Sequence, residues 1–182
     1  MTEVIKQCQK CNLCKNQRPL LDIEQNCQIF WVGLSAKKTQ SNNERPLSLN
    51  TNSGKILHSV EEKCGNIVTY KTNLVKCLPL TDEKKLRYPT VREIDCCYDN
   101  LMVEIKALSP HIVFLLGEKV CAAVEKHLTI QLPKWEGYSY NYLTYEGIHY
   151  VPIQHPSYIY VYRRNKMDDY INGIKIVIDR LL

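Results

Sequence analysis

The hydrophobic pattern of the chain consists of four short apolar runs separated by longer segments of mixed polar and apolar positions. The short runs are rich in β-branched residues and have the length of buried strands. The longer segments repeat apolar side chains at the spacing of amphipathic helices, and Thr90 with Glu93 adds a capping-box signal to one of them. The predicted strands are 28–34, 66–75, 111–117 and 149–154, and the predicted helices are 54–65, 90–108, 118–128 and 167–182.

This alternation of strands and helices predicts the fold class. Parallel strands need crossover connections, and the helices of those connections cover both faces of the sheet. We expect an α/β protein, a three-layer αβα sandwich with a mostly parallel central four-stranded sheet. No repeat or linker divides residues 1–182, so we expect one domain. Because ligands bind beyond the carboxyl ends of strands in such sheets, we expect the chemistry at 33–37, 73–77, Gly117 and 155–158.

The composition of the chain indicates the cellular compartment of the protein and the kinds of partner it binds. Its 182 residues are 45% hydrophobic, which is enough to bury a core. The sequence contains neither an apolar run of about 18 residues nor a signal-peptide pattern, so we expect a cytoplasmic protein that does not enter a membrane. We also expect a monomer. The formal net charge of +5 mildly favours a polyanionic partner. Nine cysteines in a reducing compartment favour metal binding over a disulfide framework.

The spacing of the cysteines leaves several kinds of site open. Cys8 and Cys11 have the spacing of metal ligands and also of a redox dithiol, but no second pair follows to complete a zinc ribbon. Cys77 ends a predicted strand, and only one of Cys96 and Cys97 in the next helix can face it. The cysteines that we interpret as small apolar packing residues are Cys27, Cys64 and Cys121.

Five stretches of the chain together resemble one known family. In order, they are "CQKCNLC" (8–14), "YKTNLVKCLPL" (70–80), "YPTVREIDCCYDNL" (88–101), "SPHIVFLLG" (109–117) and "VPIQHPSY" (151–158). This series resembles the iron–sulfur-containing uracil-DNA glycosylases, close to families four and five of that superfamily. Each motif alone is weak, but their shared order is specific. The resemblance implies a glycosylase domain that acts on DNA.

The resemblance also implies a set of cluster ligands. Carried over position by position, they are Cys8, Cys11, Cys77 and Cys97. Four thiolates suit a [4Fe–4S] cluster with a structural role, and zinc in the same four-thiolate site is the alternative. Cys14 is then predicted to be a spectator.

The resemblance further implies roles around a base pocket. His155 would donate a hydrogen bond to the leaving base, and Asn73 would read its edge; without the resemblance, each would be an ordinary residue of a strand end or turn. The other residues expected to bind the base are Gly33, Leu34, Ser35 and Leu47. The residues expected to contact DNA are Lys37, Ser157, Tyr158, Ile159, Arg163 and Arg164, with Lys76 and Arg87 adding to salt-dependent affinity.

The first motif departs from the family pattern. Leu34 stands where family four has a water-handling Glu, and Leu47 stands where the relatives stack a Phe on uracil. Within the segment 44–54, no carboxylate follows Arg45, and Asn50 or Asn52 occupies the neighbourhood of a water-handling Asp. The polar, basic segment 37–52 is expected to line an enlarged pocket or to contact DNA.

These departures leave three functions open. The first is a glycosylase that removes a modified pyrimidine, for example from viral DNA, and the second is a conventional uracil-DNA glycosylase of base excision repair. The third is a catalytically inactive DNA-binding module. An active enzyme is expected to be monofunctional, because no lysine stands out as a catalytic amine; Lys37 is the nearest candidate.

Overall fold

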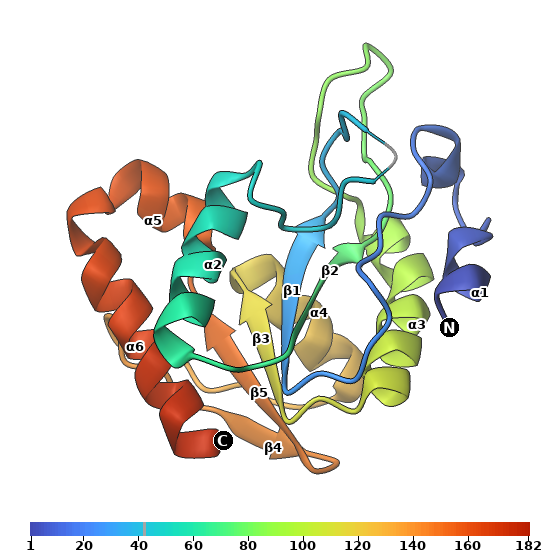
Figure 1. Cartoon of the computed structure of the whole chain (residues 1–182). Helices are drawn as coiled ribbons and strands as arrows, with labels where there is room; N and C mark the ends of the chain where they lie inside the picture. The colour runs from blue at the N-terminus through green and yellow to red at the C-terminus, as the bar shows by residue number, and fades with distance from the viewer. Residues whose placement is uncertain (42) are drawn as a thin grey trace.

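A computed structural model, which describes residues 1–41 and 43–182, shows a central sheet between two layers of helices (Figure 1). The strand order is β2-β1-β3-β5-β4. The strands are β1 (Ile29–Ser35), β2 (Thr69–Val75), β3 (Ile112–Leu116), β4 (Leu143–Tyr145) and β5 (Ile148–Ile153). The helices are α1 (Thr2–Lys6), α2 (Asn52–Cys64), α3 (Val91–Leu108), α4 (Glu118–Leu128), α5 (Pro156–Tyr162) and α6 (Met167–Leu181), with 3-10 turns η1 (Asn12–Lys15) and η2 (Arg164–Lys166).

The α/β class and the mostly parallel sheet are confirmed, but the expected count of four strands is wrong. β1, β2, β3 and β5 are parallel, and β4 is a fifth strand that pairs antiparallel with β5. β4 has only three residues and no buried side chain, so it shows no apolar run. The feature that marks the β4–β5 hairpin is the two-residue turn Glu146–Gly147. Both residues have positive φ, as tight hairpins require.

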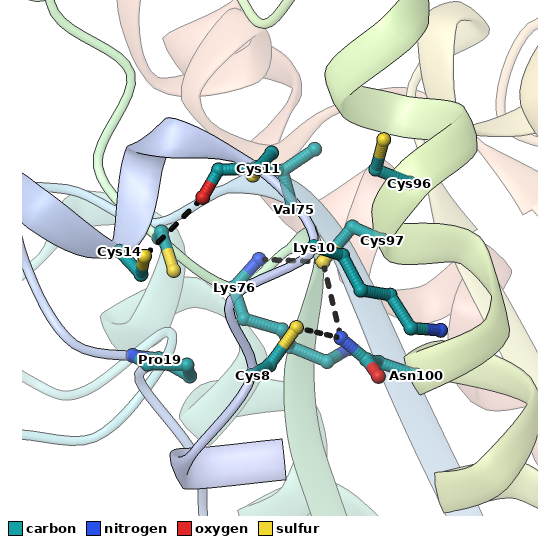
Figure 2. Close-up of a pocket in the computed structure, with 11 residues that line it drawn as sticks. Cys8, Lys10, Cys11, Cys14, Pro19, Val75, Lys76, Cys96, Cys97 and Asn100 are labelled. Atoms are coloured by element: carbon teal, nitrogen blue, oxygen red, sulfur yellow. Dashed lines mark hydrogen bonds between the residues drawn. The ribbon is translucent and has the colours of Figure 1, made fainter.

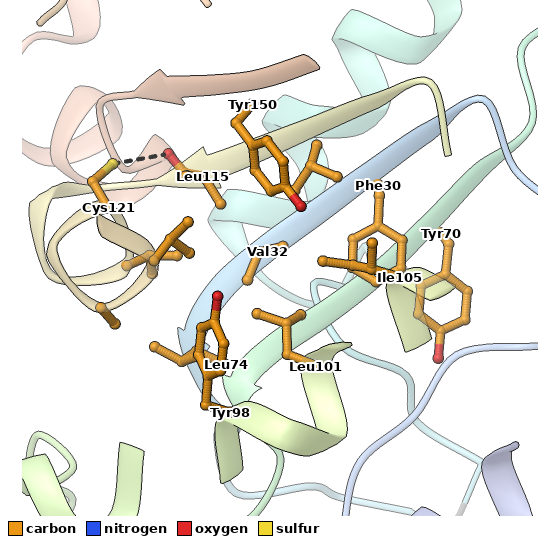
Figure 3. Close-up of a cluster of buried hydrophobic side chains, with 14 of the residues drawn as sticks. Phe30, Val32, Tyr70, Leu74, Tyr98, Leu101, Ile105, Leu115, Cys121 and Tyr150 are labelled. Carbon is orange, nitrogen blue, oxygen red and sulfur yellow. Dashed lines mark hydrogen bonds between the residues drawn. The ribbon is translucent and has the colours of Figure 1, made fainter. Parts of the chain in front are cut away.

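The two faces of the sheet have separate cores because side chains alternate along each strand. On one face, Phe30 and Val32 of β1 pack with residues of α3 and α4 (Figure 3). On the other face, Ile29 and Trp31 pack with residues of α2 and α6. All four of these β1 side chains are fully buried, which explains why β1 is a continuous apolar run in the sequence.

The helix boundaries follow local signals where those signals exist. Thr90 and Glu93 form the predicted capping box at the start of α3, and α4 spans the predicted residues. The segment after His155, which lies outside the predicted strands and helices, forms helix α5. His155 is its N-cap and Pro156 its first residue, a position that favours Pro. Because α5 has only seven residues, its apolar periodicity is too short to predict a helix.

The N-terminal segment lies outside the sheet, beside α3 (Figure 1). Lys10 forms an ion pair with Asp99 of α3 at 2.8 Å, and the Leu20 N–H donates to the Lys76 carbonyl at 2.8 Å. These contacts hold residues 8–20 against the end of β2. Among the described helices, none is long and apolar enough to cross a membrane.

Candidate active site and cysteine pocket

Gly33 and Asn73 face each other near the carboxyl ends of β1 and β2. A Cβ atom at Gly33 would overlap Asn73 Oδ1 and lie 3.5 Å from Leu47 Cδ2, so glycine is required at this position. Asn73 is 4% exposed. The hydrogen bonds of the described residues use its carbonyl and not its side-chain amide. The buried amide is therefore free to bind a ligand.

The loop between β1 and α2 brings Leu47 to this position. Leu47 has φ +49°, a conformation that side chains rarely adopt, and its carbonyl presses against Gly54 of α2, where a Cβ would clash. The buried carboxylate of Glu44 holds the same loop through Lys37 Nζ at 2.6 Å. This hydrogen bond lowers the pKa of Glu44, so the carboxylate stays charged and paired with Lys37 within the loop.

His155 lies at the carboxyl end of β5, and its protonation is set by its neighbours. The Ser157 N–H donates to Nδ1 at 3.2 Å, and the Ser157 hydroxyl lies 2.7 Å from the same atom. Because Nδ1 accepts a hydrogen bond, the proton of the neutral ring is on Nε2. Burial lowers the pKa of His155, which favours this neutral form. His155 thus presents an Nε2–H donor at neutral pH.

The residues behind His155 fix its position. Gln154 donates to the Gly137 carbonyl at 2.6 Å and accepts from Tyr140 Oη at 2.5 Å, and its own carbonyl accepts from Tyr170 Oη at 2.8 Å. Gly117, at the end of β3, has φ +93°, and a Cβ there would lie 3.2 Å from His155 Cβ. Close packing therefore limits movement of the strand end that carries the imidazole.

A pocket lies between the N-terminal segment, the end of β2 and the start of α3 (Figure 2). The Asn100 amide lies 3.4 Å from Cys8 Sγ and 3.8 Å from Cys97 Sγ, and the Lys76 backbone N–H donates to Cys97 Sγ at 3.4 Å. The cysteines that line this pocket are Cys8, Cys11, Cys14, Cys77, Cys96 and Cys97.

The chemistry of this pocket is that of soft sulfur donors. Burial raises the pKa of the Cys11, Cys77 and Cys97 thiols, so they need a bound cation to become thiolates. Figure 2 shows the Cys97 sulfur directed toward Lys76 and Asn100, whereas the Cys96 sulfur points away. In residues 1–41 and 43–182, no group of three or more His, Cys, Asp or Glu is arranged to hold a single metal ion.

Comparison with known proteins identifies the family. The family model described as the uracil DNA glycosylase superfamily matches residues 22–175. The chain belongs to this superfamily. It is therefore a DNA glycosylase of the uracil DNA glycosylase superfamily, an N-glycosidic bond hydrolase with DNA as its substrate.

Two further matches agree with this membership. The chain is 25% identical over 171 residues to the type-4 uracil-DNA glycosylase of Thermotoga maritima, with 92% of this chain and 85% of that protein covered. It is also similar to the crystal structure of wild-type Pedobacter heparinus SMUG2, with a TM-score of 0.57 and 11% identity over 86% of this chain and 76% of that one. The second likeness concerns the fold alone.

Of the residues predicted to form the base pocket, Gly33, Asn73 and Leu47 come together. Leu34 instead packs against the core between β1 and the α3–α4 layer, and Ser35 is a half-buried partner of Val75 on β2. The two residues predicted to handle water, Asn50 and Asn52, are exposed at the start of α2. Asn42, within the predicted segment 37–52, lies outside the described residues.

Two of the predicted DNA contacts are wrong because their side chains are buried, and a third, Arg87, is half-buried in an ion pair, so its DNA contact stays a prediction. Ile159 is 0% exposed and belongs to the core beneath α5, and Lys76 is likewise 0% exposed. Arg87 forms a bidentate ion pair with Glu93 at 2.6 and 2.8 Å, which ties its guanidinium to α3. The alternation of polar and apolar residues along a strand does not show which lysine or arginine side chain the fold buries.

The other predicted DNA contacts remain near the surface. Tyr158 is exposed on α5, and its ring centre lies 5.4 Å from that of the still more exposed Tyr162, which the sequence interpretation missed. Arg163 and Arg164 are exposed, and the Arg164 guanidinium lies 5.2 Å from the Tyr160 ring centre. Lys37 is half-exposed and paired with Glu44. Ser157 hydrogen-bonds His155 rather than standing free.

The sequence interpretation also missed several polar residues of the site. Glu44 and Glu104 are buried carboxylates with no motif around them, and Asn100 bonds two cysteine sulfurs. Ser157 carried a signal, because a hydroxyl two residues after a helix-capping His is within reach of its ring. The partners of Glu44, Asn100 and Glu104 come from distant segments or long loops and leave no such local pattern.

Proposed function

We propose that the protein hydrolyses the N-glycosidic bond of a flipped-out pyrimidine nucleotide in DNA and leaves an abasic site. The observation that carries this proposal is the presence, at the carboxyl ends of the strands, of two polar groups that have no hydrogen-bond partner among residues 1–41 and 43–182. They are the side-chain amide of Asn73 and the Nε2–H of His155. Among the described residues, Tyr98 Oη is the only fully buried side-chain polar atom without a partner, so the Asn73 amide and His155 Nε2 remain accessible to a ligand.

The two groups suit the two tasks of the reaction. The Asn73 amide offers both an acceptor and donors to the edge of a pyrimidine. Cleavage leaves negative charge on the base, and the neutral His155 ring donates a fixed hydrogen bond to it, with Ser157 orienting the ring. Exposed Tyr158 on α5 is suited to fill the gap left by the flipped nucleotide, and Arg163 and Arg164 to bind phosphates.

The base that this pocket favours is a modified pyrimidine larger than uracil. Leu47 offers an aliphatic wall beside Gly33 and Asn73, without the stacking of an aromatic ring. No carboxylate is free to take a proton from water in this loop, because Glu44 is paired with Lys37. Asn50 or Asn52 would orient the water without deprotonating it, which suffices when the sugar cation forms before attack. The chain acts as a monofunctional enzyme, since Lys37 is committed to Glu44.

We further propose that Cys8, Cys11, Cys77 and Cys97 hold a [4Fe–4S] cluster. The all-sulfur donor set, the N–H groups of Lys76 and Asn100 directed at sulfur, and the type-4 relative support this cofactor. Four cysteines without the paired spacing of a zinc ribbon support a cluster over a single zinc ion. When bound, the cluster supplies a covalent link between the N-terminal segment, β2 and α3.

The test is mass spectrometry of the bases that the protein releases from uracil-containing, unmodified and hypermodified phage DNA. Release of a modified pyrimidine, with abasic sites revealed by alkaline heating, is the expected result. Release of free uracil alone would make it a conventional uracil-DNA glycosylase. Retarded DNA in a gel shift without any released base would contradict the enzyme and support an inactive binding module.

A further inference from the structure

Lys76 carries a buried charge that has no role in the proposed reaction. Its side chain is 0% exposed, and its ammonium group donates to the Asn73 carbonyl at 2.6 Å and to Glu104 Oε2 at 2.6 Å. Glu104, on α3, is also fully buried. A buried ion pair is seldom more stabilising than apolar side chains of the same size. Stability alone therefore does not account for this pair.

The partners of Glu104 locate the pair behind the base pocket. The carboxylate accepts from Tyr70 Oη at 2.9 Å and from Thr72 Oγ1 at 3.1 Å. Tyr70 and Thr72 alternate with Asn73 along β2, so they face α3 while the Asn73 side chain faces Gly33 on the other side of the sheet. The network thus reaches Asn73 from behind, through its backbone carbonyl.

The same residue also contacts the cysteine pocket. The Lys76 backbone N–H donates to Cys97 Sγ at 3.4 Å, and Asn100 lies within 3.8 Å of that sulfur. Cys97, Asn100 and Glu104 follow one another at helical spacing, so one face of α3 serves the cysteine pocket at one end and the Lys76 ammonium at the other. Lys76 is therefore in direct contact with both regions.

We propose that Lys76 and Glu104 are positioning residues that set the orientation of the Asn73 side-chain amide. Because the Lys76 backbone also contacts the cysteine pocket, the position of that pocket influences the orientation of this amide. This rests on the proposed function, in which Asn73 reads the base. The ammonium fixes the Asn73 carbonyl, the rigid peptide fixes the direction of the Asn73 side chain, and Glu104 holds the ammonium in place. Without the pair, the pocket keeps its shape in outline but loses its discrimination between bases.

Two variants separate this role from stability. Lys76→Met leaves Glu104 buried without its cation and is expected to lower the melting temperature strongly. Lys76→Met combined with Glu104→Gln removes both charges and keeps acceptors for Tyr70 and Thr72, so the melting temperature and the visible absorbance of the cluster recover toward those of the wild type. The Asn73 carbonyl still lacks its donor in the double variant. Lys126→Met, which breaks an exposed lysine–aspartate pair between α4 and α3, is the matched control.

The measurement is the equilibrium affinity for two DNA duplexes, one carrying a non-cleavable analogue of the released nucleotide and one carrying an abasic-site analogue. The ratio of the two dissociation constants isolates the contribution of the base from that of the phosphates. In the double variant we expect this ratio to fall about tenfold or more, the size of a lost base-edge contact, with binding to the abasic duplex unchanged. The control should keep the wild-type ratio.

The outcomes separate this proposal from the function on which it rests. A double variant that melts like the wild type and keeps the wild-type ratio would overturn the positioning role alone. Equal losses on both duplexes would overturn it as well, because they would show general damage rather than a change at Asn73. A wild-type protein with no base-dependent affinity for any pyrimidine would overturn the proposed function together with it.

Discussion

The base pocket and the cysteine pocket adjoin the same end of β2, yet they are built in opposite ways. Around the proposed base pocket, the hydrogen bonds among the described residues leave the Asn73 side-chain amide unused and engage only Nδ1 of the His155 ring. Around the cysteine pocket, the sulfurs of Cys8 and Cys97 already receive hydrogen bonds from protein N–H groups. This difference agrees with the proposal that the base pocket binds a nucleotide transiently and that the cysteine pocket holds a cofactor permanently.

This difference shows how each region should fail. Residues of the base pocket sit on strand ends that the two cores already hold, so their removal should cost rate or affinity and leave the fold intact. The cysteines tie the N-terminal segment, which lies outside the sheet, to the end of β2 and to α3, so their removal should lower the stability of the fold. The predictions below test that separation, from the largest expected effect to the smallest.

Removal of a cluster ligand has the largest expected effect. Cys11→Ser or Cys77→Ser should abolish the bound iron and the brown colour and strongly lower the melting temperature, because the binding free energy of a structural metal centre contributes directly to folding. Iron analysis, visible absorbance and thermal unfolding measure this. Cys14→Ser is the matched control, since Cys14 lies in the same pocket and is predicted to be a spectator. Loss of iron in the control would mean that the ligand set is assigned wrongly.

Loss of the His155 side chain should affect the reaction alone. His155→Ala is expected to lower the single-turnover rate by about 10²–10³-fold, the typical cost of losing one donor to a developing anion. Iron content and melting temperature should stay close to those of the wild type, which makes this variant the opposite of Cys11→Ser. An unchanged rate would remove His155 from the mechanism.

Loss of the Asn73 amide should weaken recognition of the base. Asn73→Ala is expected to cost about 1–3 kcal/mol of discrimination between the preferred base and its competitors, the value of one bidentate edge contact. Competition between two labelled substrates measures the ratio of their kcat/KM values. The salt dependence of DNA binding, which reports phosphate contacts, should not change. A variant with full discrimination would show that another residue reads the base.

The smallest expected effect is the pH dependence of activity, which reports the environment of His155. Burial holds the pKa of His155 below its usual value of about 6.5, so activity is expected to be constant near neutrality. It should fall as the pH drops through that lowered pKa, because a proton on Nδ1 would face the Ser157 N–H. The unfolded chain takes up this proton already near pH ~6.5, so stability should also decline between that pH and the lower folded pKa. An acid limb of activity centred above the usual His pKa would contradict the buried, neutral ring.

The outcome for individual residues shows what kind of information the sequence carries. Thr90 and Glu93 predicted the start of α3 correctly, because both partners of a capping box lie within one helical turn. The strand ends that carry Gly33, Asn73 and His155 were also placed correctly, because buried strands are continuous apolar runs. The strand β4 and the helix α5 were missed, since three and seven residues are too few to show a period.

The sequence by itself therefore determined the order of the longer strands and helices, the superfamily and the positions of the motifs, all of which depend on neighbouring residues along the chain. Only the tertiary structure decided which charges are buried and what they contact. Lys76 follows a strand like any surface lysine, and Ile159 precedes a tyrosine in a segment expected to touch DNA, yet both are fully enclosed. Burial and pairing arise where β2 meets α3 and where α5 meets the sheet. Those contacts join residues far apart in the chain, so no local pattern encodes them.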